Sequence, residues 1–261
     1  QSMSYEDFIE GLKPMSHNGQ LQYALADGIL KEIALRASED PIQPYVLIID
    51  EINRGNVAGI FGELISLLEE DKRMGAEHAL QIRLPYSKTL FSLPSNLYIL
   101  GTMNTADRNI ESLDIALRRR YNFRLMLPKP ELLPKICRLP STEEEIDLSS
   151  ILFAINRRLE VLLDADHLIG HAYLWGIDSL ESLNNIFETK IIPLLEEYFY
   201  GNLAKVGLVL GKAFIEELPK SNINFADFSV SDQEDIYFKS IYRIITFPHT
   251  TNDYRAIYVN F

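Results

Sequence analysis

Cysteine is almost absent from this sequence of 261 residues, in which Cys137 is the single example. One cysteine cannot form an internal disulfide, and the sequence has no Cys/His cluster with the spacing of a metal site. The apolar runs are also short, and each is interrupted well before the about 18 residues that a membrane-spanning helix needs. No signal peptide opens the sequence. These absences predict a cytoplasmic, soluble protein that makes no contact with a membrane.

Positive charge is scarce as well. The sequence has 25 Lys and Arg residues against 37 Asp and Glu, which gives a formal net charge of −12. A chain of this charge repels a phosphate backbone, so any contact with DNA has to come through another domain or subunit. The hydrophobic fraction of 47% and the charged fraction of 24% are those of a globular protein long enough for two domains.

Two apolar segments predict the centre of an α/β fold. The run "YVLIIDE" is typical of a strand buried on both faces, and it ends at Asp50 and Glu51. A second apolar strand, "NLYILGTMN", ends at Asn104. Between them, apolar residues at helical spacing predict an amphipathic helix from Val57 to Leu68, for which Asn56 is the expected N-cap.

The rest of the sequence divides at a proline-rich stretch near residue 128. Before it we predict helices after Ser4 and over 29–37 and 112–119, a turn at 18–19, a hairpin around "PYSK" and a strand over 121–126. After it we predict helices over 152–163, 180–191 and 194–210, and a short tail with strands in "DIYFKSIYRIITF" and "YRAIYVNF". The predicted order is therefore an α/β unit over 1–128, a helical unit over 129–215 and a β tail over 216–261.

Asp50 and Glu51 are the first candidates for chemistry. Open α/β sheets place their ligand sites at the carboxyl ends of the strands, where this pair lies. A nucleoside triphosphatase needs one carboxylate for Mg²⁺ and a second to orient or deprotonate the attacking water. The alternative is a solvated strand end whose acids have no role.

Asn104 and the arginines that follow it are weaker signals. An amide at the end of a neighbouring strand can hold the same water, although such a residue is more often an ordinary turn residue. Arg118, Arg119 and Arg120 end a helix, where cations interact favourably with the helix dipole. Their functional interpretation is an arginine finger that reaches the nucleotide of a neighbouring subunit.

Longer stretches carry a resemblance to a known family. The segments "VLIIDEINRGNVAGIFGELISLLEEDKR", "LPYSKTLFSLPSNLYILGTMNTADRNIESLDIALRRRYNF", "HLIGHAYLW" and "IIPLLEEYFYGNLAKVGLVLG" resemble the AAA+ module of the McrB family, the motor subunits of McrBC modification-dependent restriction systems. The resemblance implies a partial AAA+ P-loop NTPase core, a parallel sheet flanked by helices, followed by a helical lid. It also implies that "IIDE" is the Walker B strand, with Asp50 as the Mg²⁺ ligand, Glu51 as the catalytic base, Asn104 as the γ-phosphate sensor, and Arg119 or Arg120 as the finger that acts in trans.

Further residues of these segments have open interpretations. Asp107 and Arg108 are expected to contact the nucleotide, and bracing of their loop or contact with a partner are the alternatives. "NTAD" also resembles the guanine-reading NKxD box of GTPases, but Thr105 replaces the lysine, which favours the sensor interpretation. The resemblance places His171 near the nucleotide, whereas a packed or surface histidine is the simpler interpretation. Trp175 is expected in the core.

The family's phosphate-binding loop, GxxxxGK[ST], is missing from this sequence. The similar stretch "GLVLGKA" at 207–213 has the wrong spacing, lacks the final Ser or Thr, and is interpreted as packing at a helix end. We therefore expect a fragment that starts after the P-loop and that is inactive alone.

The resemblance implies a function for the full-length protein. The resemblance implies a GTPase, with an ATPase as the less favoured alternative, that uses Mg²⁺. It also implies a homo-oligomeric ring that drives an McrC-like nuclease on modified DNA. The alternatives are a non-hydrolysing assembly scaffold and a protein remodeller like the MoxR and dynein-related ATPases.

Overall fold

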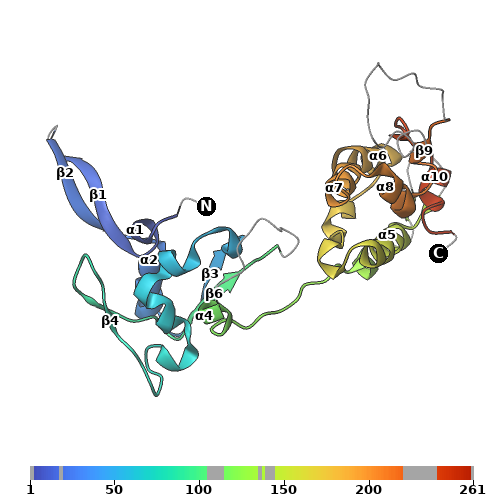
Figure 1. The fold of residues 1–261 in the computed structure, drawn as a ribbon. Coiled ribbons are helices and arrows are strands. Elements are labelled where there is room, and N and C mark those ends of the chain that lie inside the picture. Colours follow the sequence, from blue (N-terminus) through green and yellow to red (C-terminus); the bar gives the residue numbers. More distant parts are fainter. Residues whose placement is uncertain are drawn as a thin grey trace, which may run out of the picture. The chain divides into compact units, whose positions relative to one another are not determined.

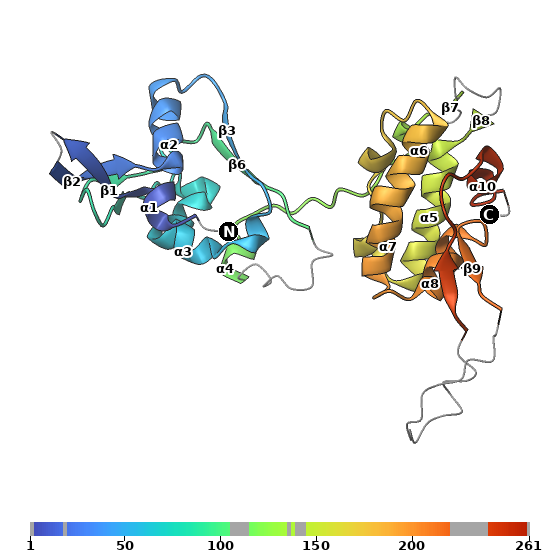
Figure 2. The ribbon, with the colours of Figure 1, turned by 90° about the horizontal axis from the view of Figure 1, so that it is seen from above.

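A computed structural model describes residues 3–17, 20–104, 115–134, 137–138, 145–219 and 240–259. The chain forms two compact units, residues 1–124 and 125–261, each with its own hydrophobic core (Figures 1 and 2). Among the described helices, none has the length and apolar character to cross a membrane. The predicted three-part boundaries stay a prediction.

The centre of the first unit is a parallel pair of strands, as the sequence predicts. Strand β3 (Tyr45–Ile49) lies beside β6 (Leu97–Gly101), with Tyr45 opposite Leu97 and Ile49 opposite Gly101. The prediction that β3 is buried on both faces is wrong, because helices cover only one face of the strand pair within the described part of the chain. The opposite face exposes between 53% and 64% of the side chains of Val46, Ile48, Tyr98 and Leu100.

The helix predicted after β3 is right in its start and its buried face, but it is not continuous. The Asn56 side chain accepts a hydrogen bond of 2.9 Å from the Gly59 amide and caps α3 (Val57–Phe61). At Gly62 the backbone turns into the left-handed region, with φ of +52°, and a 3₁₀ helix over Gly62–Leu68 follows. Glycine suits this position because it reaches positive φ at little cost, and a Cβ would also lie 3.2 Å from the Tyr5 ring.

Two antiparallel hairpins belong to the same unit. The longer hairpin follows the first helix of the chain, precedes the second, and projects from the unit (Figure 1). The hairpin predicted around "PYSK" is confirmed, although its strands are short. The elements are α1 (Tyr5–Phe8), β1 (Glu10–His17), β2 (Gln20–Asp27), α2 (Ile29–Glu39), a 3₁₀ turn (Glu70–Lys72), β4 (Ile82–Arg83) and β5 (Leu90–Phe91).

The end of the first unit departs from prediction. Helix α4 (Ile115–Arg118) falls inside the predicted helix over 112–119, whose first residues lie outside the described ones. The strand predicted over 121–126 is wrong. That segment has irregular backbone and pairs with none of the described strands, and a strand without a neighbour lacks the hydrogen bonds that hold it.

The second unit is helical, as predicted. Figure 2 shows α5 (Leu148–Leu162), α6 (Leu180–Ile186) and α7 (Ile192–Tyr198) packed together. A buried aromatic cluster of Phe187, Phe214 and Tyr254 lies in the core of this unit. The single helix predicted over 194–210 is two helices, because Tyr200 and Gly201 both take positive φ. The elements are a 3₁₀ turn (Pro130–Leu132), β7 (Cys137–Arg138), β8 (Glu145–Ile146), α5 (Leu148–Leu162), 3₁₀ turns (Ala165–His167, His171–Leu174), α6 (Leu180–Ile186), a π-helical turn (Phe187–Ile191), α7 (Ile192–Tyr198) and α8 (Leu203–Leu210).

The tail contains one predicted strand and one unexpected helix. Strand β10 (Tyr242–Ile244) pairs with β9 (Ile215–Glu217). The strand predicted in "YRAIYVNF" is wrong over its described residues, 254–259. A capping box between Thr250 and Asp253 starts α10 (Thr251–Arg255), which reaches into this stretch, and turns follow over 256–259. Trp175 is 62% exposed, so its predicted core position is also wrong. The stretch 207–213 does lie at a helix end, where Gly211 follows α8 with φ of +95°.

Candidate active site

Polar side chains gather at the carboxyl ends of β3 and β6. Because the two strands are parallel, Asp50 and Glu51 follow β3 at the same edge at which Thr102 and Asn104 follow β6. Glu51 has φ of +51° and ψ of +47°, a left-handed conformation that costs a residue other than glycine on the order of 1 kcal/mol. Such a cost at a strand end in a polar cluster is typical of a functional site.

Thr102 connects the two strand ends. Its hydroxyl donates a short hydrogen bond to Asp50 Oδ1 and accepts one of 3.0 Å from the Glu51 amide. Its own amide donates to the Ile49 carbonyl at 3.0 Å, and its carbonyl accepts from the Ile52 amide at 2.9 Å. The residue that follows β6 therefore holds four consecutive residues at the end of β3.

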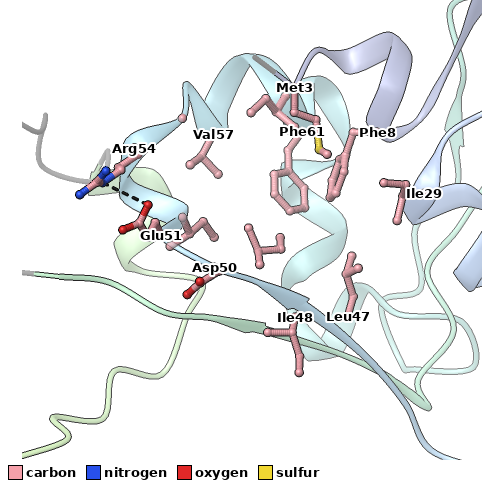
Figure 3. A pocket seen from close by; sticks show the side chains of 14 residues that line it. Met3, Phe8, Ile29, Leu47, Ile48, Asp50, Glu51, Arg54, Val57 and Phe61 are labelled. Atoms are coloured by element: carbon pink, nitrogen blue, oxygen red, sulfur yellow. Dashed lines mark ion pairs between the residues drawn. The ribbon is translucent and has the colours of Figure 1, made fainter. Parts of the chain in front are cut away.

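Asn104 is held near the same turn through its backbone. The Asn53 side-chain amide donates to the Asn104 carbonyl at 3.3 Å. On the other side of the turn, Arg54 Nε lies 3.2 Å from Glu51 Oε2 (Figure 3). The structure thus brings together three of the predicted site residues, Asp50, Glu51 and Asn104, and it adds an ion pair that holds the Glu51 carboxylate.

The three arginines of "RRR" have different surroundings. Arg118 lies over the Phe123 ring, with 5.7 Å between the guanidinium carbon and the ring centroid. Arg120 Nε lies 2.8 Å from Glu69 Oε1 within the same unit. Arg119 is exposed, and no described residue forms an ion pair with it. Asp107 and Arg108, predicted to contact nucleotide, lie outside the described residues.

An apolar pocket of about 320 Å³ adjoins the acids (Figure 3). Its walls are mainly aliphatic and aromatic, and Asp50, Glu51 and Arg54 lie on its lining. Among the described residues that line it, Arg54 is the only cation. A polyphosphate carries several negative charges, so this pocket does not by itself supply a phosphate cradle.

The donor atoms at this edge suit a hard cation. Asp50 offers a carboxylate, and its neighbours offer further oxygen atoms. Mg²⁺ is usually held by one or two carboxylates together with water and substrate phosphates, so a single protein carboxylate is sufficient. The described residues contain no group of three or more His, Cys, Asp or Glu side chains that could hold a metal without a substrate. The site therefore fits a Mg²⁺ ion that binds together with a nucleotide.

His171 lies in the second unit, where its Nδ1 accepts a hydrogen bond of 3.2 Å from the Lys129 amide. The side chain is half-buried there, and its expected place near a nucleotide stays a prediction. Thr102 is the residue that sequence reasoning missed. Its only sequence signal is a hydroxyl two positions before Asn104, and its role depends on the register that places Gly101 beside Ile49.

Comparison with known proteins places this geometry in a family. Residues 1–121 match the model of the AAA domain of the dynein-related subfamily, so the first unit is an AAA domain. Residues 147–207 match the model of the α-helical lid domain of McrB. The chain belongs to the McrB-type AAA+ proteins, and the predicted fold of an AAA+ core followed by a helical lid is confirmed.

Two curated relatives are components of restriction enzymes. The chain is 36% identical over 226 residues to the type IV methyl-directed restriction enzyme EcoKMcrB subunit of Escherichia coli (strain K12), a match that covers 77% of this chain and 46% of that protein. It is 26% identical over 247 residues to the type II restriction enzyme BsuMI component YdiS of Bacillus subtilis (strain 168), covering 88% of this chain and 70% of that protein. The chain thus spans about half the length of the McrB subunit.

Proposed function

We propose that this chain contains the hydrolytic edge of a nucleoside triphosphatase motor subunit in a restriction system. The observation that carries the proposal is the cluster of Asp50, Glu51 and Asn104 at the carboxyl ends of two parallel strands. An AAA domain and two relatives from restriction enzymes support it.

Each residue of the cluster has a role in this proposal. Asp50 would hold Mg²⁺, which would neutralise charge on the nucleotide phosphates. Glu51 accepts a proton from the attacking water or orients it, and the Asn104 amide holds that water from the side. The ion pair with Arg54 engages Glu51 Oε2, so a water molecule would meet the carboxylate at Oε1 unless the pair opens.

The phosphate cradle has to come from elsewhere in the full-length protein. The sequence has no GxxxxGK[ST] motif, and the match covers only 46% of the McrB subunit. We infer that residues 1–261 alone hydrolyse no nucleotide. In the full-length protein we expect GTP as the nucleotide and ATP as the alternative.

The partners that we expect for the full-length protein rest on the same similarity to the McrB family. Subunits assemble into a ring in which the arginine finger acts in trans, and Arg119 suits this role because it is exposed. An McrC-like nuclease supplies DNA cleavage, and modified DNA is contacted through another domain or subunit, as the charge of −12 requires.

Nucleotide turnover by the full-length protein tests this proposal. Asp50→Asn should lower Mg²⁺-dependent hydrolysis of GTP or ATP by at least about 100-fold, since one charge of the metal ligand is lost. Glu39→Gln, an equivalent loss of charge at the exposed end of α2, is the matched control and should leave turnover unchanged. Wild-type turnover in Asp50→Asn would show that the hydrolytic site does not lie at this edge. A wild-type protein that hydrolyses no nucleotide would show that the chain is an assembly scaffold instead.

A further inference from the structure

We propose that Thr102 is a positioning residue of the hydrolytic site, whose hydroxyl orients the Asp50 carboxylate and fixes the backbone of Glu51. The proposal rests on the function proposed above, because it assigns a role within that reaction. Thr102 touches neither the water nor the nucleotide in this account, and it acts through the two acids.

The hydrogen-bonding capacity of the hydroxyl determines its two contacts. A threonine hydroxyl has one hydrogen to donate and lone pairs that accept. The hydrogen is directed to Asp50 Oδ1, and a lone pair receives the Glu51 amide at 3.0 Å. A hydrogen bond from an O–H group to an ionised carboxylate is stronger than one between two neutral groups.

This arrangement makes the two oxygens of Asp50 different. Oδ1 is occupied by the Thr102 hydroxyl, whereas Oδ2 accepts no hydrogen bond from the residues that the structure describes. The carboxylate is thereby held in one rotation, with Oδ2 available to a cation. Loss of the hydroxyl would let the carboxylate rotate, and the metal ligand would be less well ordered before binding.

The second contact supports an unusual backbone at Glu51. The left-handed conformation of this residue directs its side chain away from the line of the strand. The Glu51 amide faces the Thr102 hydroxyl, and the next amide, that of Ile52, donates to the Thr102 carbonyl at 2.9 Å. Without the hydroxyl, the Glu51 amide loses its acceptor and the position of the base is less restricted.

Substitutions at Thr102 can distinguish the effect of the hydroxyl from that of the rest of the side chain. Thr102→Val keeps the branched shape and both backbone hydrogen bonds, so β3 and β6 should stay paired. Thr102→Ser restores the hydroxyl and removes only a methyl group. Thr189→Val is the matched control, since it removes a hydroxyl that bonds to the Asn185 carbonyl in the helical unit.

The test measures turnover and nucleotide affinity in the full-length protein. Thr102→Val should lower kcat by about 10- to 100-fold, leave the affinity for nucleotide without Mg²⁺ unchanged, and weaken the Mg²⁺-dependent gain in affinity measured by calorimetry about tenfold. Thr102→Ser should return both quantities to within about threefold of the wild type, and Thr189→Val should change neither. A wild-type kcat and Mg²⁺ gain in Thr102→Val would overturn the proposal, and so would an equal loss in Thr102→Ser.

Amide hydrogen exchange separates this proposal from the proposed function. Exchange over residues 50–52 should become about tenfold faster in Thr102→Val and stay unchanged in Thr102→Ser. A wild-type protein without turnover would refute the proposed function. Unchanged exchange in Thr102→Val would refute the proposal that the Thr102 hydroxyl fixes the strand end. Faster exchange with normal turnover in Thr102→Val would show that the Thr102 hydroxyl fixes the strand end but does not contribute to hydrolysis.

Discussion

The base of the long hairpin offers a quantitative test of how the first unit is held together. The Glu10 carboxylate is fully buried and accepts hydrogen bonds from Lys31 Nζ at 2.8 Å and from the amides of Tyr86 and Ser87 at 3.0 and 2.8 Å. Lys31 also pairs with Asp27 at 2.7 Å. One buried charge therefore joins β1, α2 and the loop between β4 and β5.

Glu10→Gln should destabilise this junction by a large amount. Removal of one partner from a buried ion pair typically costs about 3–5 kcal/mol. Lys31 keeps Asp27 as a partner, so we expect a cost at or below the bottom of that range, roughly 2–3 kcal/mol, or about a 30- to 150-fold change in the opening equilibrium. The glutamine cannot satisfy all three donors, because one end of its amide is itself a donor.

The pKa of Glu10 adds a pH dependence. Burial opposes its ionisation, but hydrogen bonds from Lys31 and Ser87 outweigh burial and hold the pKa of Glu10 below its ordinary value. A lowered carboxyl pKa stabilises the fold at pH values above the unfolded pKa of about 4.3. This contribution is lost as the pH falls through the folded pKa. Between about pH 6 and pH 3, a range that spans the unfolded pKa, the free energy of unfolding should therefore fall less in Glu10→Gln than in the wild type.

Hydrogen exchange measured by mass spectrometry can follow this junction separately from the second unit. Peptides from residues 10–27 should exchange faster in Glu10→Gln, whereas peptides from α5 should not change. Glu39→Gln makes the same chemical change at an exposed position of α2 and should behave as the wild type. Equal protection of residues 10–27 in the wild type and Glu10→Gln would refute the reasoning that this buried charge holds the hairpin.

Three further predictions concern the second unit, the subunit contact and the isolated chain. Burial lowers the pKa of His249, and Asp253 opposes this shift. The unfolded chain therefore takes up a proton at this histidine more readily than the folded state does, and stability should fall as the pH drops below about 6.5. His249→Phe should make stability less dependent on pH in this range, as measured by urea unfolding followed by Trp175 fluorescence. An unchanged pH dependence would argue against it. Mixing full-length Arg119→Ala subunits with Glu51→Gln subunits should restore some turnover if the finger acts in trans, and no rescue at any ratio would exclude that geometry. Residues 1–261 alone should show no measurable heat with GTP in calorimetry, whereas micromolar binding would mean that another element replaces the P-loop.

Local features of the fold could be predicted because their causes are local. The helix cap at Asn56 depends on neighbours within a turn, and the strands β3 and β6, which end at Ile49 and Gly101, follow from apolar runs. The breaks at Gly62 and Gly201 were missed, since glycine is compatible with both a helix and its interruption.

The connections within the site could not be predicted from sequence. The role of Thr102 depends on the register between two strands about 50 residues apart, and the pairing of Glu51 with Arg54 depends on the left-handed turn at Glu51. The exposed position of Trp175 depends in the same way on how the helices of the second unit pack. Residue identity gives the chemistry of a side chain, whereas its partners are set by the tertiary fold.

The separation of nucleotide binding from hydrolysis in Glu51→Gln tests the central claim most directly. In the full-length protein this variant should bind nucleotide with wild-type affinity in calorimetry and should lose hydrolysis by at least about 1000-fold, because the base is neutralised while the metal ligand at Asp50 remains. Turnover retained within about tenfold of the wild type would remove Glu51 from the role of base and contradict the proposed hydrolytic edge.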